Sequence, residues 1–194
     1  EEYLYERTNV KNFGLPTKIK YYGGSSGTTL KSYKTLDYFF ETNSTYLGRY
    51  MVDYIKNETA YSSTGTKLKE TQTKYFSTTG KYGAIDEIKK WKTGGTYLTW
   101  NYGYDCNYYN TLVTITIDLP GTAGTETYKY SYGVLSELKR PGYTTYPELS
   151  RTISSYNSAI LSETNQHGGT MSFTYDNLDR VTRIDMPTGF NDIA

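Results

Sequence analysis

Side chains that could perform catalysis are few in this sequence, and their spacing forms no recognisable site. His167 is the only histidine and Cys106 the only cysteine, so the spacing encodes neither a zinc cluster nor a Cys–His nucleophile pair. Asp86 and Glu87 are adjacent, so on a strand they would point to opposite faces and could not act together as a carboxylate pair. A partner carboxylate far away in the sequence stays open. We expect no catalytic residue, no metal site and no cofactor.

Aromatic side chains are the second group that could bind a ligand. Tyrosine accounts for 24 residues, against 6 Phe and 2 Trp. Rows of exposed Tyr and Trp can contact sugar rings, whereas the same residues on neighbouring strands form cross-strand ladders that stiffen a sheet. The densest group comprises Trp91, Tyr97, Trp100, Tyr102, Tyr104, Tyr108 and Tyr109. We expect a structural ladder there. The alternative is a glycan-contacting face, with candidate contacts Trp91, Tyr97, Trp100, Tyr102 and Tyr104.

Composition predicts the class of elements that must position these side chains. Tyr and Thr are both common on pleated, half-buried surfaces, and 18 Gly supply turns. The 21 basic and 20 acidic residues give a net charge of +1 without blocks of one sign, which removes the electrostatic argument for binding nucleic acid. No run of 18 apolar residues occurs, so we expect no membrane insertion.

Strict alternation of apolar and polar residues predicts β-strands. Val113, Ile115 and Ile117 alternate with Thr114 and Thr116, which predicts that the three apolar side chains share a buried face. Segments 126–132 and 170–175 alternate in the same way. Turn signals, either Gly-Gly pairs or Pro-Gly combinations, separate these segments.

The turn signals recur along the chain. Pro120 and Pro141 lie about 21 residues apart, and Pro187 follows after roughly twice that distance. A repeat of about 20 to 25 residues explains this spacing. Each unit would be a β-hairpin that extends one antiparallel sheet and covers the edge of its neighbour. We therefore expect one domain of such repeats over residues 1–194.

Two segments carry a competing helical pattern. Leu149, Ile153, Tyr156 and Ile160 fall at helical spacing, and the segment 30–40 does so more weakly. Ser and Thr crowd the first segment and compete for backbone hydrogen bonds, which disfavours a helix.

The most specific pattern lies at residues 168–189. There a Gly and a short strand precede Tyr175-Asp176-Asn177-Leu178-Asp179-Arg180, and a second strand and a Pro-Thr-Gly turn follow. Asp176 can bond backbone N–H groups of the turn, with Arg180 opposite it and Tyr175 packed inward. The residues that define this pattern are Gly169, Tyr175, Asp176, Asp179, Arg180, Pro187 and Gly189.

This pattern resembles the Rhs/YD repeat, the β-hairpin repeat of bacterial Rhs and Tc toxins, wall-associated proteins and teneurins. Asp179 stands where the family usually has Gly, at a position that needs a positive φ, which Asp tolerates less well than Gly. Tyr156-Asn157-Ser158-Ala159 and Tyr130-Ser131-Tyr132-Gly133 look like degenerate copies.

The resemblance implies an all-β fold in which consecutive antiparallel hairpins form one large curved, spiralling sheet or an arc of a shell. It implies a non-catalytic structural module of a secreted or cell-surface protein, in which residues 1–194 are a fragment or a subunit of a larger assembly. Neighbouring repeats would associate by strand addition, and a shell of such repeats could enclose an effector domain. The alternative function is a carbohydrate-binding adhesin module that uses exposed Tyr and Trp.

Overall fold

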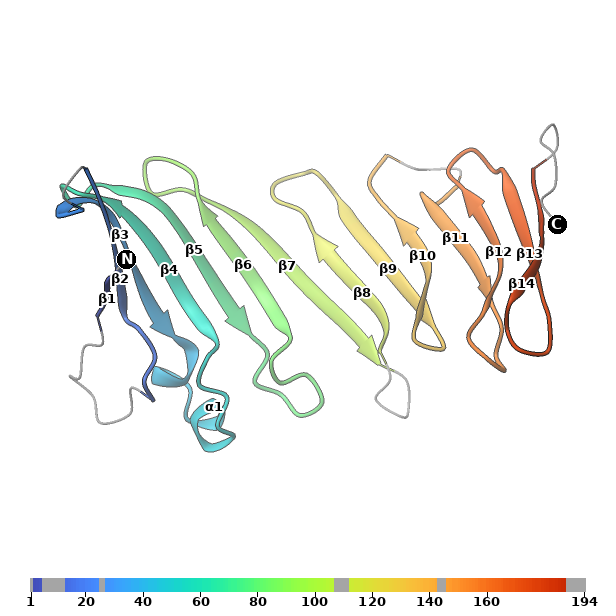
Figure 1. Ribbon diagram of the computed structural model, residues 1–194, viewed down its shortest axis with the longest axis horizontal. Coiled ribbons are helices and arrows are strands. Elements are labelled where there is room, and N and C mark those ends of the chain that lie inside the picture. Colours follow the sequence, from blue (N-terminus) through green and yellow to red (C-terminus); the bar gives the residue numbers. More distant parts are fainter. Residues whose placement is uncertain (1, 5–12, 25–26, 107–111, 143–145, 188–194) are drawn as a thin grey trace. The chain divides into compact units, whose positions relative to one another are not determined.

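The computed structural model describes residues 2–4, 13–24, 27–106, 112–142 and 146–187. The chain forms two compact units, Glu1–Asn101 and Tyr102–Ala194, and Figure 1 shows strands lying side by side in chain order within each. The predicted all-β chain of consecutive antiparallel hairpins is confirmed. Its behaviour as a single domain stays a prediction.

The first unit contains seven strands, the last of which continues past the unit boundary. They are β1 (Glu2–Leu4), β2 (Lys18–Gly23), β3 (Thr29–Tyr38), β4 (Ile55–Ser62), β5 (Lys67–Tyr75), β6 (Ile85–Trp91) and β7 (Tyr97–Cys106). The second unit adds β8 (Leu112–Asp118), β9 (Thr125–Ser131), β10 (Val134–Lys139), β11 (Leu149–Ile153), β12 (Ile160–Asn165), β13 (Thr170–Tyr175) and β14 (Val181–Asp185). Two short helices, η1 (Phe39–Glu41) and α1 (Ser44–Gly48), lie between β3 and β4.

Strand β8 shows the alternation that the sequence predicts, but not the predicted burial. Ile115 lies opposite Tyr128 and Thr116 opposite Thr127 on β9, so apolar and polar side chains occupy different faces. All of Val113, Ile115 and Ile117 are nevertheless only half-buried, as are the two threonines between them. The prediction of a buried face is wrong because, among the described residues of the second unit, no helix or second layer of strands covers it.

The helical alternative is wrong for both segments. Leu149–Ile153 is β11 and Ile160 begins β12, while Tyr156 lies in the turn between them and is 97% exposed. The segment 30–38 belongs to β3. The backbone of β11 pairs with β10 on one side and β12 on the other. After the strand, Ser154 Oγ accepts hydrogen bonds from the N–H groups of Tyr156 and Asn157 in the turn. Of the two short helices that do form, η1 includes Phe40 at the end of the second segment, and α1 was not predicted.

In two hairpins of the second unit, the proline that follows the second strand lies beside the glycine that precedes the first strand. Pro141 follows β10 and packs against Gly124, which precedes β9; a Cβ atom added to Gly124 would lie 3.0 Å from the Pro141 ring. Pro187 follows β14 and lies beside Gly169, but at 3.6 Å from such a Cβ it would be in ordinary van der Waals contact. In both hairpins the proline thus lies beside the glycine that precedes the first strand, and only at Gly124 does it leave little room for a side chain.

The first unit has a local core where η1 and α1 pack on one end of the sheet. Tyr46 on α1 is fully buried, and its ring packs edge-on against Phe39 and Tyr54 at centroid distances of 4.8 and 5.5 Å. Asn43 begins α1 by accepting hydrogen bonds from the N–H groups of Thr45 and Tyr46, the usual role of an N-cap. The cap therefore positions the central ring of this core.

The Tyr46 hydroxyl joins α1 to the loop between β5 and β6. It donates to the Phe76 carbonyl at 2.6 Å and accepts from the Gly83 N–H at 3.0 Å. Burial raises the pKa of Tyr46, although the hydrogen bond from Gly83 opposes this shift. The hydroxyl thus stays neutral and serves as donor and acceptor at once.

We expect Tyr46→Phe to lower the free energy of unfolding by about 1 to 3 kcal/mol, because it leaves the Phe76 carbonyl and the Gly83 N–H without their partner. Urea unfolding monitored by tyrosine fluorescence measures this change. Tyr50→Phe is the matched control, since Tyr50 is 84% exposed. Equal stability of the two variants would show that the hydroxyl contributes nothing.

Candidate functional site

The turn between β13 and β14 has the geometry expected from its sequence. Asp176 Oδ1 accepts hydrogen bonds from the N–H groups of Leu178 at 2.9 Å and Arg180 at 3.0 Å. The Asp179 backbone has a φ of 59°. Both the predicted bonds of Asp176 and the predicted left-handed conformation of Asp179 are confirmed. Gly189, which belongs to the same pattern, lies outside the described residues.

Arg180 and Tyr175 complete this turn. Arg180 Nε donates to Asp176 Oδ2 at 2.7 Å, so one carboxylate binds the backbone and an arginine together. Tyr175 is half-buried, and its hydroxyl donates to the Ile160 carbonyl at 2.7 Å. The tyrosine thereby attaches the turn to the start of β12, the strand next to β13.

Asp179 has a second contact that the sequence did not predict. Asn157 Nδ2 donates to Asp179 Oδ1, which joins the β11–β12 turn to the β13–β14 turn. Asn157 Oδ1 also accepts from the Ala159 N–H at 3.2 Å, and Ser158 has a φ of 60°. The degenerate copy at 156–159 therefore keeps the local turn bond, but its exposed Tyr156 has no role like that of Tyr175.

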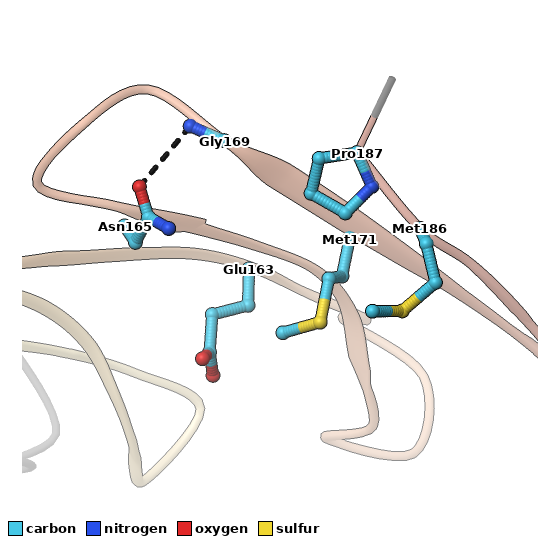
Figure 2. Close-up of a pocket in the computed structure, with 6 residues that line it drawn as sticks. All are labelled: Glu163, Asn165, Gly169, Met171, Met186 and Pro187. Atoms are coloured by element: carbon cyan, nitrogen blue, oxygen red, sulfur yellow. Dashed lines mark hydrogen bonds between the residues drawn. The ribbon is translucent and has the colours of Figure 1, made fainter. Parts of the chain in front are cut away.

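The end of the last hairpin carries a small apolar hollow. It has a volume of about 210 Å³ and is lined by Glu163, Asn165, Gly169, Met171, Met186 and Pro187. Figure 2 shows the two methionine side chains beside Pro187, and the bond by which Gly169 donates to Asn165 Oδ1 at 3.1 Å. His167 is exposed in the same β12–β13 turn, as expected for a loop residue. The one carboxylate in its lining, Glu163, is paired with Arg151 at 2.8 Å.

The structure does not bring the five glycan candidates onto one face. Trp91 lies directly opposite Tyr97, whereas Trp100 lies opposite Ile88 on the other face of β6 and β7. Tyr102 and Tyr104 follow on β7 and belong to the second unit. All five are half-buried. Tyr108 and Tyr109 lie outside the described residues.

Lysine side chains lie over both tryptophans. Lys67 Nζ is 5.0 Å from the centre of the Trp91 ring, and Lys90 Nζ is 4.9 Å from that of Trp100. A cation over the ring face is attracted to its quadrupole. Each lysine therefore covers one face of the ring on which a sugar could stack.

The best-defined polar cluster lies around Glu70 on β5. Glu70 is only 7% exposed, and it accepts hydrogen bonds from Lys67 Nζ at 2.6 Å, Gln72 Nε2 at 2.7 Å and the Tyr97 hydroxyl at 2.8 Å. Burial alone would raise the pKa of Glu70, but these three donors outweigh it and lower the pKa. The cluster is internally satisfied, so it stabilises the pairing of β5 with its neighbours.

A second cluster lies in the second unit. Arg140 contacts Glu126 at 3.4 Å and Glu148 at 2.8 Å, and the Tyr128 hydroxyl donates to Glu126 at 2.8 Å. Burial and the Glu126 charge both raise the pKa of Tyr102. The sequence did not indicate either cluster, because each depends on a contact between segments that strand pairing brings together, Tyr97 with Glu70 and Arg140 with Glu126.

Within the described ranges, no group of three or more His, Cys, Asp or Glu side chains is placed to hold a metal ion. No helix of that part of the chain is long and apolar enough to cross a membrane.

Comparisons with known proteins gave distant structural similarities. No protein-family model and no curated protein matches the chain. It is similar to the crystal structure of TcdB2-TccC3-Cdc42, with 15% identity and a TM-score of 0.35 over 85% of this chain and 11% of that one. It is also similar to a Tc holotoxin pore from Photorhabdus luminescens, with 10% identity and a TM-score of 0.35 over 93% of this chain and 11% of that one.

A porin-like protein from Bacteroides uniformis is similar over 90% of this chain and 86% of that one, with 13% identity and a TM-score of 0.25. For the two toxin structures, by contrast, this chain spans only about a ninth of the length of the chain that it matches. At these TM-scores the similarities say nothing about what this chain does.

The pH dependence of the β13–β14 turn follows from Asp176. The hydrogen bond from the Arg180 side chain, helped by backbone N–H groups, lowers the pKa of Asp176. A carboxyl group whose pKa is lower in the folded state stabilises the fold above its unfolded pKa, near 3.9, and loses this contribution as the pH falls through the folded value. Carbon-13 NMR titration should place Asp176 below the ordinary value. Arg180→Gln should raise it, and an unchanged titration would contradict the pairing.

We expect Asp179→Gly to change stability little. Glycine reaches a positive φ without the Cβ penalty, which favours the variant by up to about 1 kcal/mol, but the variant also loses the hydrogen bond to Asn157. Urea unfolding of Asp179→Gly, Asn157→Ala and the double variant separates the two effects. If the substitution at Asp179 costs the same in both backgrounds, the contact with Asn157 contributes nothing.

Proposed function

We propose that this chain is a non-catalytic structural repeat module of a secreted or cell-surface protein, and that it helps to build a shell or an extended scaffold. The observation that supports this most is the strand order, in which each hairpin pairs with the hairpins before and after it in the chain. Such a sheet can grow by adding further hairpins without changing those already present.

The turn at 175–180 supports the same proposal. It combines the sequence pattern that resembles a YD repeat with the bonds that this pattern requires, at Asp176, Asp179 and Arg180. The neighbouring glycine and proline, Gly124 with Pro141 and Gly169 with Pro187, recur in two hairpins of the second unit. These features position the two strands of a hairpin relative to each other.

Neighbouring repeats, of the same or another chain, are the proposed partners. The first and last strands of a sheet that does not close recruit further strands through unpaired backbone groups. An effector domain enclosed by a larger shell is a further proposed partner. None of the described strands contains a proline, so one of the devices that oppose edge-to-edge pairing is absent from them.

The isolated chain should therefore associate by strand addition. Sedimentation at protein concentrations up to roughly 100 μM should show dimers or larger species, and hydrogen exchange should show added protection only in terminal strands. A strictly monomeric chain over this range would count against the proposal. Association that leaves the exchange of every strand unchanged would mean that side-chain faces, and not edges, carry it.

A further inference from the structure

A polar hollow lies on the first unit, over four adjacent strands. Its volume is about 420 Å³, and its lining includes Asp37, Asn57, Gln72, Lys74 and Glu87. Asp37 lies opposite Asn57, Asn57 opposite Gln72 and Lys74 opposite Glu87, so these five side chains belong to one face of the sheet. The volume falls within the range of about 300 to 1,000 Å³ that is typical of small-molecule pockets.

The charges around this hollow cancel. Asp37 and Glu87 contribute two negative charges, and Lys56 and Lys74 contribute two positive charges. The ion pairs nearest to the hollow leave its net charge at zero, because each adds one partner of opposite sign. Lys74 pairs with Asp86 at 2.5 Å, and Glu87 pairs with Lys89 at 2.8 Å. A hollow without net charge has no electrostatic preference for an anion or a cation.

Hydrogen bonds hold two side-chain amides of the hollow, those of Asn57 and Gln72, in place. Asn57 Nδ2 donates to Asp37 Oδ2 at 3.3 Å. The buried Asn57 Oδ1 accepts no hydrogen bond from any residue that the structure describes, which is unusual for a buried polar atom. Gln72 is held by Glu70 and by the Tyr97 hydroxyl, so its orientation is fixed before any ligand arrives.

Phe39 gives the hollow an aromatic wall. Its ring is held edge-on by Tyr46 and Tyr75 of the local core, at centroid distances of 4.8 and 5.5 Å. An apolar wall beside a few fixed amide and carboxylate groups is the usual composition of a site for a small polar molecule.

We propose that the hollow of Asp37, Asn57, Gln72 and Glu87 binds a neutral, hydroxyl-rich ligand of the size of one or two sugar rings. Hydroxyl groups would donate to the carboxylates of Asp37 and Glu87, and the apolar side of a ring would lie against Phe39. This binding role goes beyond the structural role proposed above. It also lies away from Trp100, Tyr102 and Tyr104, the residues that the sequence suggested.

The test is a titration of the intact chain, followed by NMR of its side-chain amides. The neutral probes are glucose, galactose, N-acetylglucosamine and cellobiose, and the charged probes are glucuronate and glucosamine. Titration to about 50 mM covers dissociation constants in the millimolar range. We expect at least one neutral probe to shift the side-chain amide signals of Asn57 and Gln72, and to bind more tightly than its charged counterpart.

Asp37→Ala should weaken that binding at least about ten-fold, which corresponds to loss of a single well-formed hydrogen-bond acceptor. Asp37 is exposed, and Asp37→Asn provides a variant of the same shape if the alanine variant does not fold. Asp118→Ala is the matched control, because Asp118 is an exposed aspartate that accepts a hydrogen bond from Thr125 at 2.7 Å. It should leave binding unchanged.

Three results would overturn the proposal. They are the absence of binding by every neutral probe, tighter binding of a charged probe, and binding that survives both Asp37 variants. None of these results bears on strand addition, which the sedimentation and hydrogen-exchange measurements test separately.

Discussion

Backbone hydrogen bonding between neighbouring strands is the interaction on which the rest of this structure depends. Each strand of the second unit pairs with the next along the chain, from β8 with β9 to β13 with β14. A hairpin in water is marginally stable by itself, and three or more strands with a hydrophobic face are needed for independent stability. The stability of one hairpin is therefore shared with its neighbours, which is why single turns here matter beyond their own residues.

A single layer of strands leaves little room for a conventional core, and side-chain ladders take over part of that function. Tyr33 and Tyr61 stack at 4.9 Å across β3 and β4, and Lys18 lies over the Tyr33 ring. Glu70 is a buried carboxylate, and burial of a carboxylate costs free energy of folding unless the group is paired and hydrogen-bonded. Its three donors satisfy that need, so removal of any one would leave a buried charge with fewer partners.

The two units reach stability in different ways. The first unit buries Ile19, Leu36, Tyr38, Phe40 and Tyr46 in a cluster around η1 and α1. In the described part of the second unit, Ile153 is the one hydrophobic residue that is buried. Turn geometry contributes more to the stability of that unit. Tyr132 and Gly133, both with positive φ, form a two-residue turn, and Asp176 accepts hydrogen bonds within another turn. Most cross-strand ion pairs of that unit, such as Lys129 with Glu137, are partly exposed and contribute little individually.

The sequence by itself determined the all-β class, the hairpins and the chemistry of the turn at Asp176. These features are local: alternation needs only successive residues, and the bonds of Asp176 reach no further than Arg180. The tertiary structure decided which side chains meet across strands. Glu70 and Tyr97 are 27 residues apart, and Asn157 and Asp179 are 22 apart, so their contacts depend on strand register. Register is set by turn length and by bulges, such as the one between Asp37 and Tyr38, and a shift of one residue moves a side chain to the other face. For the same reason the sequence grouped Trp91 with Trp100, whereas the pairing of Trp91 with Tyr97 places the two tryptophans on opposite faces.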